Sequence, residues 1–123
     1  MSEDAPRSTP ALWNAPLRRL DGPWPEPTDP PSEADLGPWR DRIDALDEAL
    51  VHLLNERAVY AARIGQIKKK LGLPVYAPTR EDDVLRNVLD ANPGPLPPTA
   101  VRRLYERIID ETRSLERRLH DDQ

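Results

Sequence analysis

The sequence predicts an all-α protein of three helices, one long, one short and one of medium length, without strands. Two observations lead to this prediction. Apolar residues recur at alternating spacings of four and three along residues 38–71 and again along 99–119, the period of helices that pack through one face. Nine of the fifteen prolines lie within residues 1–38, where they disfavour regular structure. With 123 residues, the chain forms one small domain at most.

Residues 1–37 are expected to form a proline-rich, mostly disordered or extended tail, followed by a helical domain over residues 38–123. The tail carries the whole formal charge of −4, because the acids and bases of residues 38–123 balance. Its apolar residues are unusual for a plain linker: Trp13, Leu17, Leu20 and Trp24. A second interpretation is therefore a short segment that docks on the domain's own surface or on a partner enzyme.

The first helix is expected to begin at Pro38 and to end before Gly72 and Pro74. Its apolar positions are 39, 43, 46, 50, 53, 60, 64, 67 and 71. A helix of about 34 residues would be about 50 Å long, which exceeds the width of a compact domain of this size. We therefore expect another chain to cover its apolar stripe.

The second helix is predicted to follow a loop, with Thr79 as its N-cap and Asp82 as the capping-box partner. Its apolar side holds Val84, Leu85, Val88 and Leu89, and the sequence NPGP ends it. The third helix is predicted to begin near Thr99, with an apolar stripe at 101, 105, 108, 112, 115 and 119. Its six arginines alternate with acids, which indicates a solvated face in preference to a phosphate-binding patch.

Composition excludes several classes of function. Without cysteine, the chain can form neither disulfides nor thiolate or cysteine–metal sites. His52 and His120 lack the spacing of a ligand pair, so no metal and no cofactor is expected. The balanced charge of residues 38–123 does not favour nucleic acid or an anionic membrane. No apolar run is long enough to span a bilayer and no signal peptide is recognisable, so a cytoplasmic location is expected.

Polar residues interrupt the apolar stripes, and they are the candidate site. Arg57 replaces an apolar residue in the first helix, and a buried charge there needs an anion. Its guanidinium could form an ion pair within the protein, reach solvent at the surface, or bind an anionic ligand. Lys68 follows about 16 Å along the same helix and only about 20° around it, so the two could grip one small anion, although Lys68 alone is a typical solvated helix end. Four further polar residues on the later helices could converge on the same pocket: Arg80, Glu81, Thr112 and Glu116.

A family resemblance rests on two segments, WRDRIDALDEALVHLLNERAVYAARIGQIKKKLGLPVYAPTRE and IIDETRSLE. Together they resemble the all-helical class of chorismate mutases over about residues 36–119. The matching core consists, in order and at the family's spacing, of Arg40, Asp47, Arg57, Lys68 and the pair Arg80–Glu81. The resemblance implies an intertwined homodimer whose long helices pair and which holds two active sites.

The implied reaction is the rearrangement of chorismate to prephenate, in aromatic amino acid biosynthesis by the shikimate pathway. The resemblance assigns the two substrate carboxylates to Arg57 and to Arg40 of the partner chain, and the ether oxygen to Lys68. Geometry agrees about Arg40, since about 25 Å of straight helix separates it from Arg57 and prevents both from touching one small ligand.

The remaining roles also come from the resemblance. Glu81 accepts a hydrogen bond from the ring hydroxyl, Arg80 lines the pocket, and Thr112 stands where the family often has a serine near a carboxylate. Two positions depart from the family. Ala77 replaces an aspartate that in some members helps to bind the hydroxyl, and Glu116 replaces a glutamine that donates to the ether oxygen, although an ionised glutamate cannot donate.

Two other functions stay open on the sequence. A relative of the same fold eliminates pyruvate from isochorismate, and the departure at Ala77 keeps this activity under consideration. The other alternative is a non-catalytic helical dimer that regulates another shikimate-pathway enzyme. The complete set of cations, Arg40, Arg57 and Lys68, argues against a non-catalytic dimer, because a module without substrate has no need of them.

Overall fold

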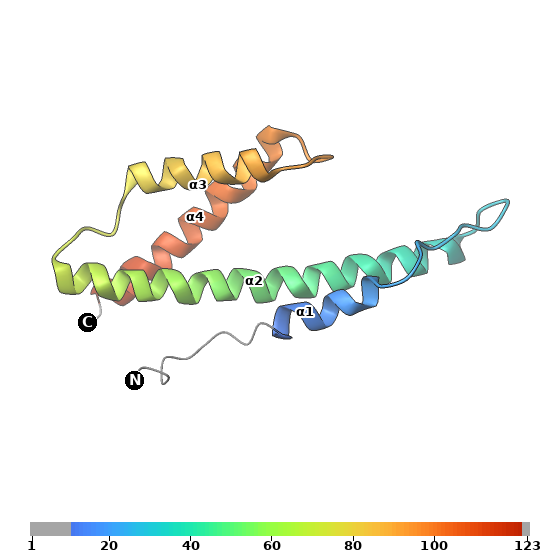
Figure 1. The fold of residues 1–123 in the computed structure, drawn as a ribbon, viewed down its shortest axis with the longest axis horizontal. Coiled ribbons are helices and arrows are strands. Elements are labelled where there is room, and N and C mark those ends of the chain that lie inside the picture. Colours follow the sequence, from blue (N-terminus) through green and yellow to red (C-terminus); the bar gives the residue numbers. More distant parts are fainter. Residues whose placement is uncertain (1–10, 122–123) are drawn as a thin grey trace. The chain divides into compact units, whose positions relative to one another are not determined.

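The computed structural model describes residues 11–121 and contains helices and no strand within that range (Figure 1). The helices are α1 (Ala11–Leu17), α2 (Leu36–Leu71), α3 (Pro78–Ala91) and α4 (Pro98–Asp121). Two short 3₁₀ turns, Arg18–Leu20 and Glu33–Asp35, lie between α1 and α2. The all-α class is therefore confirmed, and α2, α3 and α4 correspond to the three predicted helices. Helix α1 was not predicted, because Pro16 lies inside it.

The chain divides into two compact units, Met1–Arg57 and Ala58–Gln123. The boundary falls within α2, a helix of 36 residues that runs through it without interruption. No helix within residues 11–121 combines the length and the apolar character that crossing a membrane requires.

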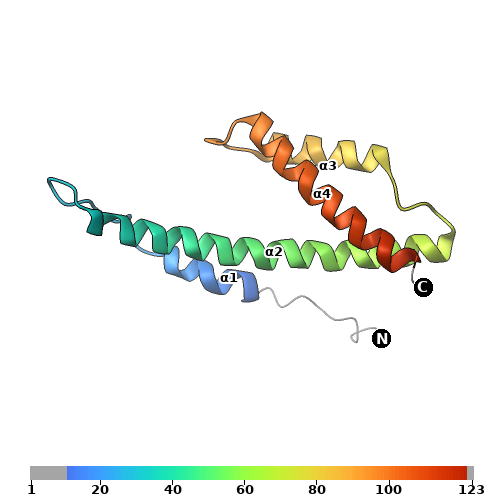
Figure 2. The same cartoon turned by 180° about the vertical axis from the view of Figure 1, so that it is seen from behind.

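In the first unit, residues 18–24 contact the early turns of α2. The Arg42 guanidinium donates hydrogen bonds to the carbonyl oxygens of Leu20 at 3.2 Å and Pro23 at 2.8 Å. The rings of Trp24 and Trp39 meet edge to face, with centroids 5.6 Å apart. Figures 1 and 2 both show α1 beside the first half of α2. These contacts put the segment on the chain's own surface, as the docking interpretation expects. Residues 1–10 lie outside the described part, and the division at residue 38 stays a prediction.

The face of α2 that this segment covers is lined by small residues. Ala45 and Ala49 are buried, and they share a helical face with Arg42 by their spacing. The predicted apolar stripe lies on a neighbouring face, and its first member, Trp39, packs on Trp24 and is 37% exposed. The next four members are each about half exposed: Ile43, Leu46, Leu50 and Leu53. The segment thus contacts the start of the stripe and leaves the members after Trp39 accessible.

In the second unit, α3 packs against α4 around the buried residues Leu85, Val101 and Ile109. Helix α3 begins differently from the prediction. Its N-cap is Ala77, Pro78 occupies the first position, and no side chain caps the helix. The predicted cap at Thr79 is therefore wrong. Proline is preset for the first helical residue, so the helix already includes Thr79 when it begins.

The turn before α2 is organised by the Asp35 carboxylate. It accepts hydrogen bonds from the backbone N–H of Ser32 at 2.8 Å, from the Thr28 hydroxyl at 2.8 Å and from the Thr28 backbone N–H at 3.1 Å. These donors, with the Ser32 N–H contributing most, hold the pKa of Asp35 below its ordinary value of 3.8. The charged carboxylate is therefore the form that holds the turn together.

We predict that this turn loosens only in acid. Because the pKa of Asp35 is lower in the folded chain, its contribution is complete above pH 3.8 and is lost as the pH falls through the lower value. In an NMR titration, the amide signals of Thr28 and Ser32 should move together with a midpoint below 3.8. Asp35→Ala should abolish this shared titration, whereas Asp29→Ala, in the same turn, should preserve it. A shared midpoint at or above 3.8 would contradict the prediction.

Candidate active site

A lysine and a buried carboxylate meet where the last part of α2 faces α4. Lys68 Nζ lies 3.1 Å from Oε1 of Glu116, and the two side chains are only 19% and 11% exposed. The same nitrogen donates a hydrogen bond of 2.7 Å to the carbonyl oxygen of Val75, in the loop after α2. Glu116 Oε1 accepts no hydrogen bond, so the contact with Lys68 is an ion pair whose angles fall outside hydrogen-bond geometry. This oxygen retains its capacity to accept.

The close approach of Glu116 to α2 depends on Gly65. A Cβ atom built on this glycine would lie 2.7 Å from Cγ of Glu116, well inside van der Waals contact. Gly65 lies one turn before Lys68 along α2, so the space it leaves is next to the ion pair. Glycine destabilises a helix interior relative to alanine. At this position a larger residue would collide with Glu116 of α4, which explains why glycine is present.

Glu81, in the first turn of α3, is held by an arginine that the sequence did not single out. Arg113 Nη1 donates to Glu81 Oε2 at 2.9 Å and to Oε1 at 3.2 Å. Its other terminal nitrogen, Nη2, donates to Asp110 Oδ1 at 2.7 Å. The guanidinium carbon also lies 5.2 Å from the ring centroid of Tyr76. The sequence grouped Arg113 with the solvated arginines of α4, whereas its side chain is 26% exposed.

The other predicted site residues, as far as the structure describes their contacts, are not brought to Lys68 and Glu116. Thr112 lies one turn before Glu116 on α4, and its hydroxyl donates to the carbonyl of Ile108 within the helix. Arg80 is exposed at the start of α3. Arg40 and Arg57 belong to the first unit, where Arg40 is exposed and Arg57 is half-buried. The structure thus joins Lys68 to Glu116, and the convergence of the full set stays a prediction.

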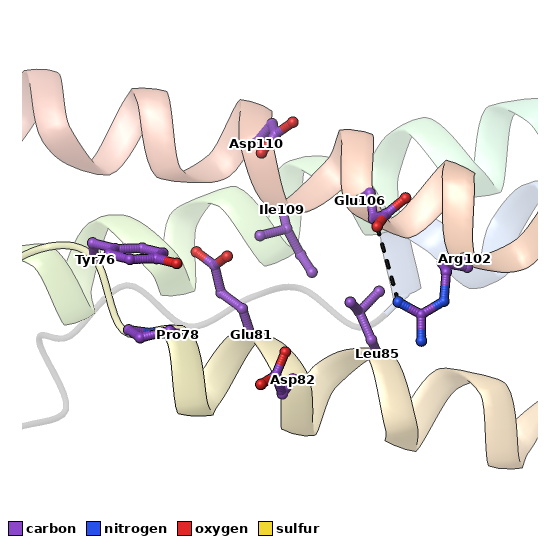
Figure 3. Close-up of a pocket in the computed structure, with 9 residues that line it drawn as sticks. All are labelled: Tyr76, Pro78, Glu81, Asp82, Leu85, Arg102, Glu106, Ile109 and Asp110. Carbon is purple, nitrogen blue, oxygen red and sulfur yellow. Dashed lines mark ion pairs between the residues drawn. The ribbon is translucent and has the colours of Figure 1, made fainter.

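A cavity of about 440 Å³ lies between α3 and α4 (Figure 3). Among the predicted residues only Glu81 lines it, and three further carboxylates do so: Asp82, Glu106 and Asp110. Its one arginine, Arg102, is ion-paired with Glu106 across 3.9 Å. Such a wall repels anions, so the carboxylates of a ligand would not enter this cavity, whereas a neutral or cationic group could approach Glu81 there.

A largely buried ion pair between α2 and α4 is compatible with a site that binds a charged small molecule, as it is with a structural ion pair. Comparison with known proteins identifies its family. Residues 39–117 match the family model described as chorismate mutase type II, and the chain belongs to this family of isomerases.

Three relatives illustrate the match. The chain is 44% identical over 84 residues to a bifunctional chorismate mutase/prephenate dehydratase of Neisseria gonorrhoeae, covering 68% of this chain and 23% of the relative. It is 36% identical over 95 residues to a 4-amino-4-deoxychorismate mutase of Streptomyces pristinaespiralis, covering 75% of this chain and 73% of the relative. A solved structure of chorismate mutase (form II) from Thermus thermophilus superposes with a TM-score of 0.66 at 34% identity, covering 68% of this chain and 94% of the other.

The bifunctional relatives are much longer than this chain. It spans 23% of the Neisseria gonorrhoeae protein and 25% of a second one from Aquifex aeolicus. The family is therefore established for the helical domain, and the all-helical class expected from the sequence is confirmed.

We predict that Gly65→Ala disturbs the contact between α2 and α4. The new methyl group would overlap Glu116, so the Glu116 side chain or the helix must move, at a cost of about 1–3 kcal/mol of unfolding free energy. Thermal and urea denaturation should show the loss. Gly37→Ala is the matched control, because nothing lies within 4 Å of its added methyl group. It should leave stability unchanged or raise it by up to about 1 kcal/mol. Equal effects of the two substitutions would show that close packing at Gly65 is unimportant.

Proposed function

We propose that this chain catalyses the rearrangement of chorismate to prephenate in aromatic amino acid biosynthesis. Membership of the family supports this reaction. In this chain itself, the observation that supports it best is the largely buried ion pair of Lys68 with Glu116. The reaction is intramolecular and pericyclic, and it needs no nucleophile and no obligatory proton transfer. The protein must hold a flexible dicarboxylate in its folded, reactive conformation and stabilise charge on the breaking ether oxygen.

In this proposal the cationic side chains bind the substrate's carboxylates and its ether oxygen, and the other polar residues orient the substrate. Arg57 and Arg40 of the partner chain each hold a substrate carboxylate, since a guanidinium matches a carboxylate in a bidentate manner. Lys68 donates to the ether oxygen. Its contact with Val75 supports this role, because a hydrogen bond to a fixed carbonyl restrains the ammonium while leaving other donors available.

Three further residues complete the proposed site. Glu81 accepts from the ring hydroxyl, Arg80 lines the pocket, and Thr112 lies near a carboxylate. The fixed position of Glu81 supports its part, since Arg113 holds both of its oxygens. Glu116 faces the ether oxygen in place of the family's glutamine, and its helpful form is the protonated one, which can donate.

We also propose an intertwined homodimer with two active sites, each completed by Arg40 of the other chain. The exposed stripe of α2 supports it, because the apolar residues of the first unit continue in the second with Ile64, Ile67 and Leu71, all at least half exposed. A contiguous apolar surface of this length is rare on a monomer and is typical of a subunit interface.

The cytoplasmic location and the tail's interaction with a partner enzyme belong to the same proposal. Trp24 supports such an interaction, because its ring packs on Trp39 yet remains 75% exposed. Exposed tryptophans are frequent anchors of protein–protein contacts.

One specific observation favours a second substrate. The Streptomyces pristinaespiralis relative, which this chain covers over most of its length, is a 4-amino-4-deoxychorismate mutase. The deciding experiment incubates the purified full chain separately with chorismate, 4-amino-4-deoxychorismate and isochorismate, and identifies the products. Prephenate from chorismate supports the proposal. Salicylate with pyruvate from isochorismate indicates the lyase, and no turnover indicates a non-catalytic dimer.

The shared site predicts complementation. Arg40→Ala and Arg57→Ala chains should each lose at least about 100-fold in kcat/KM alone, because every site lacks one carboxylate ligand. After the two are unfolded together and refolded, heterodimers should regain activity, since one of their two sites combines intact residues from both chains. Differently tagged chains allow the heterodimer to be isolated. Inactive heterodimers of confirmed composition would refute the shared site.

The proposed place of Glu116 predicts the effect of replacing it. Ionised, this carboxylate repels the charge that develops on the ether oxygen and competes with it for Lys68, from which it is 3.1 Å away. Glu116→Gln, whose amide can donate to that oxygen, should therefore exceed the wild type about tenfold in kcat. The measurement is kcat of both proteins, with circular dichroism as the folding control. Equal kcat values would place Glu116 away from the ether oxygen.

A further inference from the structure

The charge balance around Glu81 differs from that of a lone carboxylate. Glu81, Arg113 and Asp110 form one cluster, in which Nη1 of Arg113 contacts both oxygens of Glu81 and Nη2 contacts Asp110. With Arg113 the cluster carries one net negative charge, and without it the cluster would carry two. The Arg113 and Glu81 side chains are about one quarter exposed, so their charges are only partly screened by solvent.

Arg113 is also held in place from two further sides. Asp110, one turn earlier on α4, accepts from Nη2, and the ring of Tyr76 stacks near the guanidinium carbon. A guanidinium anchored in this way keeps its orientation when Glu81 accepts another donor. A carboxylate has about four acceptor sites, and Arg113 uses two of them, so Glu81 retains capacity for one ligand group.

The group that Glu81 would accept is either neutral or positively charged. A ring hydroxyl is a neutral donor, whereas a primary amine at the same position is protonated near neutral pH. The field of Arg113 acts weakly on the hydroxyl but repels the ammonium. Ala77 adds no compensating negative charge at the position where some family members have an aspartate.

We propose that Arg113 is a positioning and specificity-determining residue, which orients Glu81 and shifts the site's preference from a protonated amine toward a neutral hydroxyl on the substrate ring. This inference rests on the proposed function, because it uses Glu81 as the acceptor for that ring substituent. It goes beyond that function in assigning the choice between two substrates to a residue that does not itself touch the ligand.

The test compares chorismate with 4-amino-4-deoxychorismate on the full chain, for wild type, Arg113→Met and Arg113→Lys. In Arg113→Met, which keeps the length and loses the charge, the ratio of kcat/KM for the amine to that for the hydroxyl substrate should rise about tenfold. Arg113→Lys retains the charge, so it should hold that ratio within about threefold of the wild type even where both rates fall. A purely structural role would lower both rates and leave the ratio unchanged in both variants.

Arg107→Met is the matched control, since Arg107 is 76% exposed on the same helix and forms an ion pair with Glu111. It should leave both rates and their ratio unchanged. Melting temperatures confirm that each variant folds. Dissociation constants for both compounds, measured by calorimetry, provide a readout that is independent of turnover, and their ratio should shift in the same direction.

The outcomes separate the two proposals. A wild type that binds both compounds without turnover defeats the proposed function, while the ratio of dissociation constants still decides the role of Arg113. A ratio that Arg113→Met leaves unchanged, in an active and folded protein, overturns the inference and leaves the proposed function intact. Binding of neither compound by the wild type overturns both.

Discussion

The contact between Lys68 and Glu116 is the constraint around which the second unit is organised. Two opposite charges, both largely removed from solvent, are stable only where other groups compensate their lost hydration. The carbonyl of Val75 compensates Lys68, and this fixes the loop between α2 and α3. Gly65 leaves the space next to this ion pair that allows Glu116 to approach α2 closely.

Under the proposed function, the same contact prepares Lys68 for an anionic substrate. A lysine that is restrained by a carbonyl and faces a carboxylate has its charge oriented before any ligand arrives, so little reorganisation is needed. The carboxyl oxygen of Glu116 that accepts no hydrogen bond is an unusual feature in a buried position, where polar atoms are normally satisfied.

The pattern of burial along α2 shows how one helix serves two purposes. The face of Arg42, Ala45 and Ala49 is covered by the chain's own residues, with Arg42 tying down the backbone near Leu20 and Pro23. After Trp39, the members of the apolar stripe, such as Ile43 and Leu46, remain about half exposed. Small side chains permit close packing within the chain, whereas the larger side chains of the stripe offer the area that the proposed homodimer would bury.

The sequence by itself determined helices α2, α3 and α4, because the four–three apolar period and the proline and glycine boundaries are local signals that neighbouring residues carry together. It also indicated Lys68, through its spacing from Arg57 in the stripe of the first predicted helix, and Glu116, one turn after Thr112 in the stripe of the third. Only the tertiary structure decided that Arg113 grips Glu81, that Gly65 makes room for Glu116 and that Trp24 meets Trp39. Each of these contacts joins residues from different elements. Their spacing in the chain contains no trace of the pairing, because it arises from how helices pack and which side chains then come within reach.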